Sequence, residues 1–284
     1  MEIPDYKNLP VPENNLYSRD TKGKFLFVRH GKTEFNILQK ELGTENIKTE
    51  GKYTDGPLCD EGRAQARALQ SIVNKMEIEH VYVSPLHRTL ETCSLIFETH
   101  PDRKKFVCEI CPVITEIVNT TYDIPKYIAD NKKNFNMNSN VQFDWSKFEE
   151  LFKNDDERDF YYMNYIDTLE KDEIKEEFNN LVNANKVRKM SDAVSNLTVH
   201  AKKLGIPRLE SYKHVFNRCV KFKEFLKEKY KDTLNDTNKK VVVVTHKAFI
   251  HYSSSKLAYK MEKIDKNPED ICLVDNCEMV SIYI

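Results

Sequence analysis

Two β-prone runs in this chain each lead directly into a histidine. Phe25-Leu-Phe-Val28 is followed by Arg29-His30-Gly31, and Val241-Val-Val-Val244 is followed by Thr245-His246. Uninterrupted apolar, β-branched runs of this length are typical of strands that are covered on both faces of a sheet. Open α/β sheets bind their ligands at the carboxyl ends of such strands. The two histidines therefore mark a candidate site at one edge of a buried sheet.

Strand and helix patterns alternate along most of the chain. This alternation, with buried strands, predicts an α/β fold in three layers, a mostly parallel sheet flanked by helices. A helix is expected to start just after the first strand, with Thr33 or Gly31 near its cap, and Asp60 is the expected N-cap of another. Residues 37–57 and 131–140 are expected to form loops. The pattern predicts strands over 24–28, 80–84, 106–111, 240–246 and 279–284, and helices over 61–76, 85–100, 209–230 and 248–258.

Residues 117–205 differ in character from the segments around them. They contain helical patterns, such as Ile174, Phe178 and Leu181 on one face, and no strand stands out. We interpret them as a helical insertion that caps one end of the sheet within a single domain spanning 1–284. A separate domain is the alternative, although no Pro/Gly linker flanks the segment. Residues 1–23 are polar and are expected to form an N-terminal arm across the domain.

Composition narrows the class of protein. The net charge of −1 argues against a nucleic-acid-binding surface. The sequence contains no apolar run of 18 residues, so no transmembrane helix is expected. Seven cysteines without regular spacing indicate free thiols in a reducing compartment, so we expect a cytoplasmic protein. Cys108-x-x-Cys111 is half of a zinc pattern, but its companions Cys272 and Cys277 have a wider spacing. No metal is expected, and the sequence does not indicate the oligomeric state.

Four basic side chains converge if the strands they follow are neighbours. Arg29, His30 and His246 end two strands, and Arg88 lies in the first turn of the helix after a third. Four potential cations would repel one another in an empty pocket, but a bound dianion would offset their charge. This points to phosphoryl transfer, in which catalysis depends on positioning and charge stabilisation.

Four motifs follow one another along the chain. They are Arg29-His-Gly-x-Thr-x-x-Asn36, Asp55-x-Pro-Leu-x-x-x-Gly62, Ser84-Pro-Leu-x-Arg-x-x-x-Thr92 and Val-Val-Val-Thr-His246. Together they resemble the histidine phosphatase superfamily, in its phosphoglycerate-mutase-like branch (branch 1). The likeness covers residues 24–116 and 206–284, and Glu210-Ser211 also fits it. It implies a phosphoglycerate-mutase-like fold.

The resemblance implies roles for individual residues. His30 would be the nucleophile and form a phosphohistidine, without a metal or cofactor. Arg29, Arg88 and His246 would hold the phosphoryl oxygens, and Asn36 would donate a further hydrogen bond.

A carboxyl group must then protonate the leaving alcohol. Glu116 matches the family's place for this acid, and Glu109 is its nearest competitor. Lys247 stands where many members carry glycine; it either adds charge at the pocket rim or points to solvent. His87 either faces the site or is an ordinary histidine on the helix surface, and the latter is favoured. His214 and His251 are expected to be structural or exposed helix residues.

The resemblance favours a metal-independent phosphatase acting on a phosphomonoester. A phosphoglycerate mutase is the alternative, but the Arg-Tyr segment typical of family mutases is not seen near 119–125. A catalytically silent module that binds a phosphorylated ligand is a second alternative, although the nucleophile and clamp are present. The expected partner is a small phosphorylated substrate or a phosphoprotein, with no nucleic acid and no membrane. Because the family builds its specificity in the inserted segment, the substrate cannot be deduced from the sequence.

Overall fold

A computed structural model describes residues 16–43, 53–118, 120–125, 128–152, 172–184, 190–206, 209–255 and 273–284. Most of the predicted N-terminal arm, residues 1–15, lies outside these ranges. The arm's described end forms a two-residue strand that pairs with the last strand of the sheet.

A seven-stranded, mostly parallel sheet forms the middle of the molecule, which confirms the predicted α/β class. Its strand order is β1-β7-β2-β6-β3-β4-β5. Only the pairs β1–β7 and β7–β2 are antiparallel. The strands are Tyr17–Ser18 (β1), Phe25–Arg29 (β2), Glu77–Val83 (β3), Cys108–Ile110 (β4), Phe143–Asp144 (β5), Lys239–Thr245 (β6) and Met279–Ile282 (β7).

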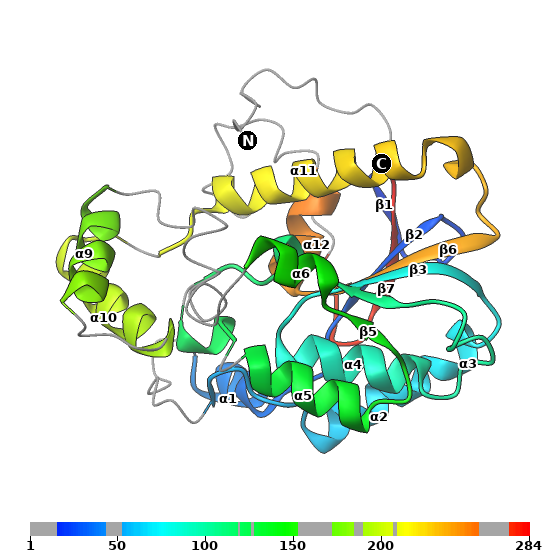
Figure 1. Cartoon of the computed structure of the whole chain (residues 1–284), viewed down its shortest axis with the longest axis horizontal. Helices are drawn as coiled ribbons and strands as arrows, with labels where there is room; N and C mark the ends of the chain where they lie inside the picture. Colours follow the sequence, from blue (N-terminus) through cyan, green and yellow to red (C-terminus); the bar gives the residue numbers. More distant parts are fainter. Residues whose placement is uncertain are drawn as a thin grey trace.

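Helices cover both faces of the sheet, as Figure 1 shows for α11 and α12 on one side and α2, α4 and α5 on the other. Alternate side chains of β2 enter two separate apolar cores, because neighbouring residues of a strand point to opposite faces. Phe25 and Phe27 pack with the α11 side, whereas Leu26 and Val28 pack with the α4 side. The helices are α1 (Glu34–Leu42), α2 (Asp60–Ala68), α3 (Gln70–Val73), α4 (His87–Phe97), α5 (Ile128–Asn138), α6 (Ser146–Leu151), α9 (Asp172–Asn183), α10 (Met190–Lys203), α11 (Tyr212–Lys229) and α12 (Lys247–Ser254), with short 3-10 turns at Pro112–Ile114 (η4), Thr121–Asp123 (η5) and Lys231–Thr233 (η6).

The strand register brings several carboxyl ends to one level. Val244 of β6 is paired with Val28 on one side and with Val83 on the other. The residues that follow these strands, His30, Ser84 and His246, therefore emerge side by side. This alignment, which the sequence predicts only if the strands are neighbours, creates the candidate site.

Several local predictions were wrong at element boundaries. The loop expected at 37–57 is helical up to Leu42, because Thr33 and Asn36 form a reciprocal cap that starts α1. Cys59, not Asp60, is the N-cap residue of α2, and Asp60 lies in its first turn.

The asparagine-rich segment 131–140 is largely helical rather than a loop. It belongs to α5, where burial of Ile128, Asn131 and Phe135 outweighs the weak helix propensity of asparagine. The insertion also supplies β5, which extends the sheet at β4, although no strand was expected there. In α9 the predicted apolar face of Ile174, Phe178 and Leu181 is buried.

Gly62 allows α2 to touch the loop that follows β2. A β-carbon at Gly62 would lie 2.0 Å from the carbonyl oxygen of Lys32, so the backbone would have to move. Replacing Gly62 with alanine should lower the free energy of unfolding by about 2 kcal/mol or more. Denaturant unfolding measures this loss. Gly56→Ala is the matched control, because its nearest atom would be 3.5 Å away; equal stability losses in the two variants would contradict the steric explanation.

Candidate active site

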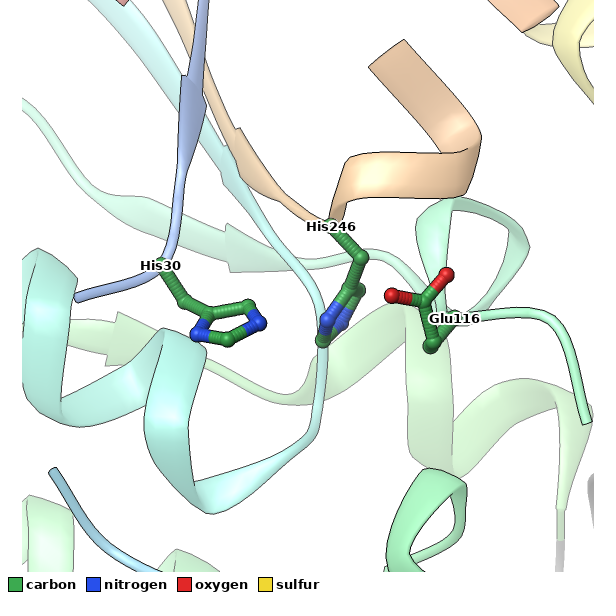
Figure 2. Close-up of side chains that lie close together, drawn as sticks. All are labelled: His30, Glu116 and His246. Carbon is green, nitrogen blue, oxygen red and sulfur yellow. The ribbon is translucent and has the colours of Figure 1, made fainter. Parts of the chain in front are cut away.

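Four segments of the chain meet at the carboxyl edge of the sheet. His30 follows β2, His246 follows β6, Arg88 lies in the first turn of α4, and Glu116 lies two residues after η4. The His30 and His246 rings have centroids 5.2 Å apart. In Figure 2, His30 and Glu116 point toward His246 from opposite sides. The structure therefore brings together residues that the sequence could place only at separate strand ends.

The main chain selects the tautomer of His30. Its Nδ1 lies 2.8 Å from the carbonyl oxygen of Gly31, which can only accept a hydrogen bond. The proton is therefore on Nδ1, and Nε2 keeps its lone pair. Burial, together with the charges of Arg88 and Arg29, lowers the pKa of His30 well below its ordinary value. His30 is thus a neutral imidazole with a nucleophilic nitrogen at neutral pH.

Two hydroxyl groups fix the surroundings of the histidines. Ser84 Oγ lies 2.8 Å from His246 Nε2. Nδ1 of His246 is buried and has no hydrogen-bond partner within the described part of the chain. Thr92 Oγ1 accepts a hydrogen bond from the Gly31 N–H and donates one to the Arg88 carbonyl. Burial, reinforced by the charge of Arg88, lowers the pKa of His246 as well. In the motif Ser84-Pro-Leu-x-Arg-x-x-x-Thr92, the resemblance implied a role for Arg88 alone. These contacts show that Ser84 and Thr92 hold the main chain and the rings around the site.

Arg88 is fully buried, yet its guanidinium is only partly satisfied by protein atoms. Nη1 donates to the Tyr122 carbonyl at 3.0 Å, and the guanidinium carbon lies 4.5 Å from the Tyr122 ring centroid. Nε and Nη2 are buried, and neither has a hydrogen-bond partner among the residues that the structure describes. Leaving N–H groups of a buried cation unpaired is costly, so such groups are usually found where a ligand completes the site.

Arg29 and Asn36 offer further donors, and both line one cavity together with His30. Arg29 Nη1 donates to the Val274 carbonyl, while no described residue is a hydrogen-bond partner of its buried Nε. Asn36 Oδ1 accepts from the N–H and hydroxyl of Thr33 and from Asn276 Nδ2. Because the amide oxygen is occupied in this way, the amide nitrogen of Asn36 is the group available as a donor.

The two candidate carboxyl groups have opposite surroundings. Glu116 lines the cavity beside His30, and burial raises its pKa, although the charges of Arg88 and Arg29 oppose the shift. Burial alone would raise the pKa of Glu109 too, but hydrogen bonds from His80 and Lys147 lower it to about 2. Glu109 lies in β4 and does not line this cavity. Glu116 is therefore the carboxyl group suited to hold a proton at this site.

A buried network that sequence reasoning did not foresee holds the segment carrying Glu116. Arg218 of α11 donates to the carbonyl oxygens of Val113 and Thr115 at 2.7 and 3.0 Å. Glu210 accepts from Arg218 Nε and Nη2, and its other oxygen accepts from the Val118 N–H at 2.8 Å. Both ends of the 113–118 segment are thus fixed to α11 or its start. Only Glu210-Ser211 carried a sequence signal for this contact.

One cavity of about 350 Å³ opens onto His30. Its walls include residues outside the predicted site, notably Tyr122 of η5. His251, expected to be structural or exposed, is buried and lines the cavity, and so does Lys247. His87 and His214 do not line it: His87 faces Asn131 of α5, and His214 binds Glu210.

His30, Glu116 and His246 are also the group, within the described ranges, that could hold a metal ion. Their donor atoms all lie within 4.8 Å of one another. Two neighbouring guanidinium groups disfavour a cation at this position and favour an anion. Among the helices in the described part of the chain, none is long and apolar enough to cross a membrane.

Comparisons with known proteins agree with the motifs. Residues 25–138 match the family model of the histidine phosphatase superfamily (branch 1). A probable phosphatase of Schizosaccharomyces pombe is 30% identical over 111 residues, 38% of this chain and 48% of that protein. A probable phosphoglycerate mutase of Serratia proteamaculans is 38% identical over 71 residues, 25% of this chain and 29% of that protein. The chain thus spans about half the length of the first curated relative and less of the second.

Solved structures similar to this chain include a phosphatase and a phosphoglycerate mutase. The phosphoserine phosphatase of Entamoeba histolytica, in complex with 3-phosphoglyceric acid, shares 17% identity, covers 90% of this chain and 88% of its own, and gives a TM-score of 0.40. The phosphoglycerate mutase of Bacillus anthracis shares 13% identity over 93% of both chains, with a TM-score of 0.43. Because both TM-scores lie below 0.5, the fold assignment rests on strand order and register. The family match agrees with the motifs: residues 25–138 of this chain are similar to the histidine phosphatase superfamily (branch 1).

Proposed function

We propose that the protein is a metal-independent phosphatase that hydrolyses a phosphomonoester through a phosphohistidine on His30. One observation carries the proposal: the buried guanidinium of Arg88 keeps two N–H-bearing atoms unpaired beside two neutral imidazoles. Arg88 and Arg29 supply two positive charges, which match a phosphate dianion. The neutral state of His30 leaves it free to act as a nucleophile.

In the first half of the reaction, Nε2 of His30 attacks phosphorus and the bond to the ester oxygen breaks. Glu116 donates its proton to that oxygen, and the alcohol leaves. The Nδ1–H bond to the Gly31 carbonyl stabilises the positive charge that develops on the imidazole ring. Arg29, Arg88, His246 and Asn36 hold the phosphoryl oxygens, where charge is greatest during transfer.

In the second half, the Glu116 carboxylate takes a proton from water. The water oxygen attacks phosphorus, the phosphorus–nitrogen bond breaks, and inorganic phosphate is released. His30 recovers its lone pair and Glu116 its proton, so the cycle is balanced. A group whose pKa is raised, as that of Glu116 is, can serve as acid and then as base near neutral pH.

A phosphoglycerate mutase would use the same residues but return the phosphoryl group to a second hydroxyl. The relatives include both a probable phosphatase and a probable mutase. Hydrolysis is favoured because it needs only access for water and no mutase-type Arg-Tyr segment. Efficient interconversion of phosphoglycerates with slow ester hydrolysis would reverse this choice.

Removal of the nucleophile should abolish turnover. We expect the wild-type protein to hydrolyse para-nitrophenyl phosphate in the presence of a chelator, and His30→Ala to lower kcat/KM about a thousandfold or more. His200→Ala, in α10 and away from the cavity, is the matched control and should retain wild-type rates. Loss of wild-type activity on chelation, or full activity of His30→Ala, would disprove the mechanism.

The proton role of Glu116 should depend on the leaving group. Glu116→Gln should slow hydrolysis of an alkyl phosphate by about 100-fold or more, because an alkoxide is a poor leaving group. With para-nitrophenyl phosphate the first step needs little acid, so rapid mixing should show a burst of nitrophenol followed by slow turnover.

The pH profile provides the control for this variant. In the wild type, activity should fall on the acid side as His30 takes a proton below its ordinary pKa of 6.5. It should fall on the alkaline side as Glu116 loses its proton above its ordinary pKa of 4.5. Glu116→Gln should lack the alkaline limb; an unchanged bell-shaped profile would assign the acid to another group.

A further inference from the structure

Lys247 places a positive charge at the cavity that contains the nucleophile. It is the first residue of α12 and directly follows His246. It lines the same 350 Å³ cavity as His30, and its side chain is exposed. Its ammonium group forms no hydrogen bond or ion pair with any residue in the described ranges. The ammonium charge of Lys247 is therefore accessible to a ligand that binds in the cavity.

The same face of α12 carries other cavity-lining groups. His251 lies four residues after Lys247, which puts the two side chains on one side of the helix. Tyr252 of α12 and Tyr212 of α11 also line the cavity, and their ring centroids lie 5.4 Å apart. Figure 1 shows α11 and α12 on the same side of the sheet, and these four side chains, which the two helices contribute to the cavity lining, are called its wall here. The wall combines polar and aromatic surface.

We infer that this wall is a second anion subsite, and that the substrate is a small phosphomonoester whose leaving group carries a carboxylate or a second phosphate. The inference rests on the proposed function, because it takes the end of the cavity lined by Arg29 and His30 as the site of the transferred phosphoryl group. Lys247 then binds the far charge by a charge-assisted hydrogen bond, with His251 beside it. The tyrosine rings contact the carbon chain between the two anions.

The acidic side chains of the cavity do not cancel this subsite. Asp123 uses Oδ2 to accept hydrogen bonds from the N–H and the hydroxyl of Thr120, at 2.9 and 3.3 Å. Glu116 belongs to the reacting end, next to His30 and His246. The cavity volume is near the lower end of the range for small-molecule pockets, which favours a short leaving group.

Binding of two stable phosphonates tests the subsite without requiring turnover. One is a butanoate chain with a terminal phosphonate; the other is its isostere, in which an isopropyl group replaces the carboxylate. Calorimetry with the full chain should show tighter binding of the carboxylate compound by about fivefold at low salt. This preference should shrink as the ionic strength rises, because exposed charges are screened.

Substitution of Lys247 assigns the preference to this residue. Lys247→Met should bring the ratio of the two dissociation constants to about one, because the preference for the carboxylate compound is lost. Lys247→Arg should largely restore that preference. Lys75→Met removes an equally exposed lysine outside the cavity and should keep the wild-type ratio. Equal affinities in the wild type, or equal effects of Lys247→Met and Lys75→Met, would overturn the subsite.

The two proposals fail in different ways. If the wild type hydrolyses para-nitrophenyl phosphate but binds both phosphonates equally, the phosphatase proposal stands and the subsite is wrong. If the affinity ratio depends on Lys247 but no phosphate ester is hydrolysed, the subsite stands and the phosphatase proposal is wrong. If neither phosphonate binds, the cavity is not a phosphate site, and both are wrong.

Discussion

The candidate site depends on holding like-charged groups together at one edge of a sheet. Arg88 is buried beside Arg29. Burying a charged group lowers the stability of the folded protein, by on the order of several kcal/mol, unless partners compensate for the lost hydration. The protein lowers this cost by keeping His30 and His246 neutral and by stacking Arg88 on Tyr122. The charge that remains unpaired is the charge that a phosphate dianion would neutralise. Stability and function are therefore linked at the same position.

The scaffold fixes the reacting groups from several directions. The backbone carbonyl of Gly31 selects the tautomer of His30, and Ser84 orients His246. Arg218 of α11 and Glu210, which lies just before α11, hold the segment that carries Glu116. Because each of these supports comes from a different element, the geometry of the site is set by the packing of the whole sheet and both helical layers.

Sequence patterns predicted the sheet, its mostly parallel class and the strand ends that carry His30 and His246, because buried β-branched runs and terminal glycines are local signals. Patterns could not show that Glu116 rather than Glu109 lies at the cavity. That distinction depends on His80 and Lys147, which approach Glu109 from β3 and α6. They also missed α5 and β5, where tertiary burial outweighs weak local propensity. The sequence allows two interpretations of Lys247, and the structure places it in the lining of the cavity that His30 also lines.

Trapping the covalent intermediate tests the central claim most directly. Wild-type protein mixed with a phosphomonoester, quenched within milliseconds in alkali and digested, should yield a peptide containing His30 with one added phosphoryl group. That modification should be lost in acid, as expected for a phosphorus–nitrogen bond, and it should accumulate in Glu116→Gln, whose second step is slow. A phosphoryl group on another residue, or steady turnover with no phosphorylated peptide at any time, would contradict the account.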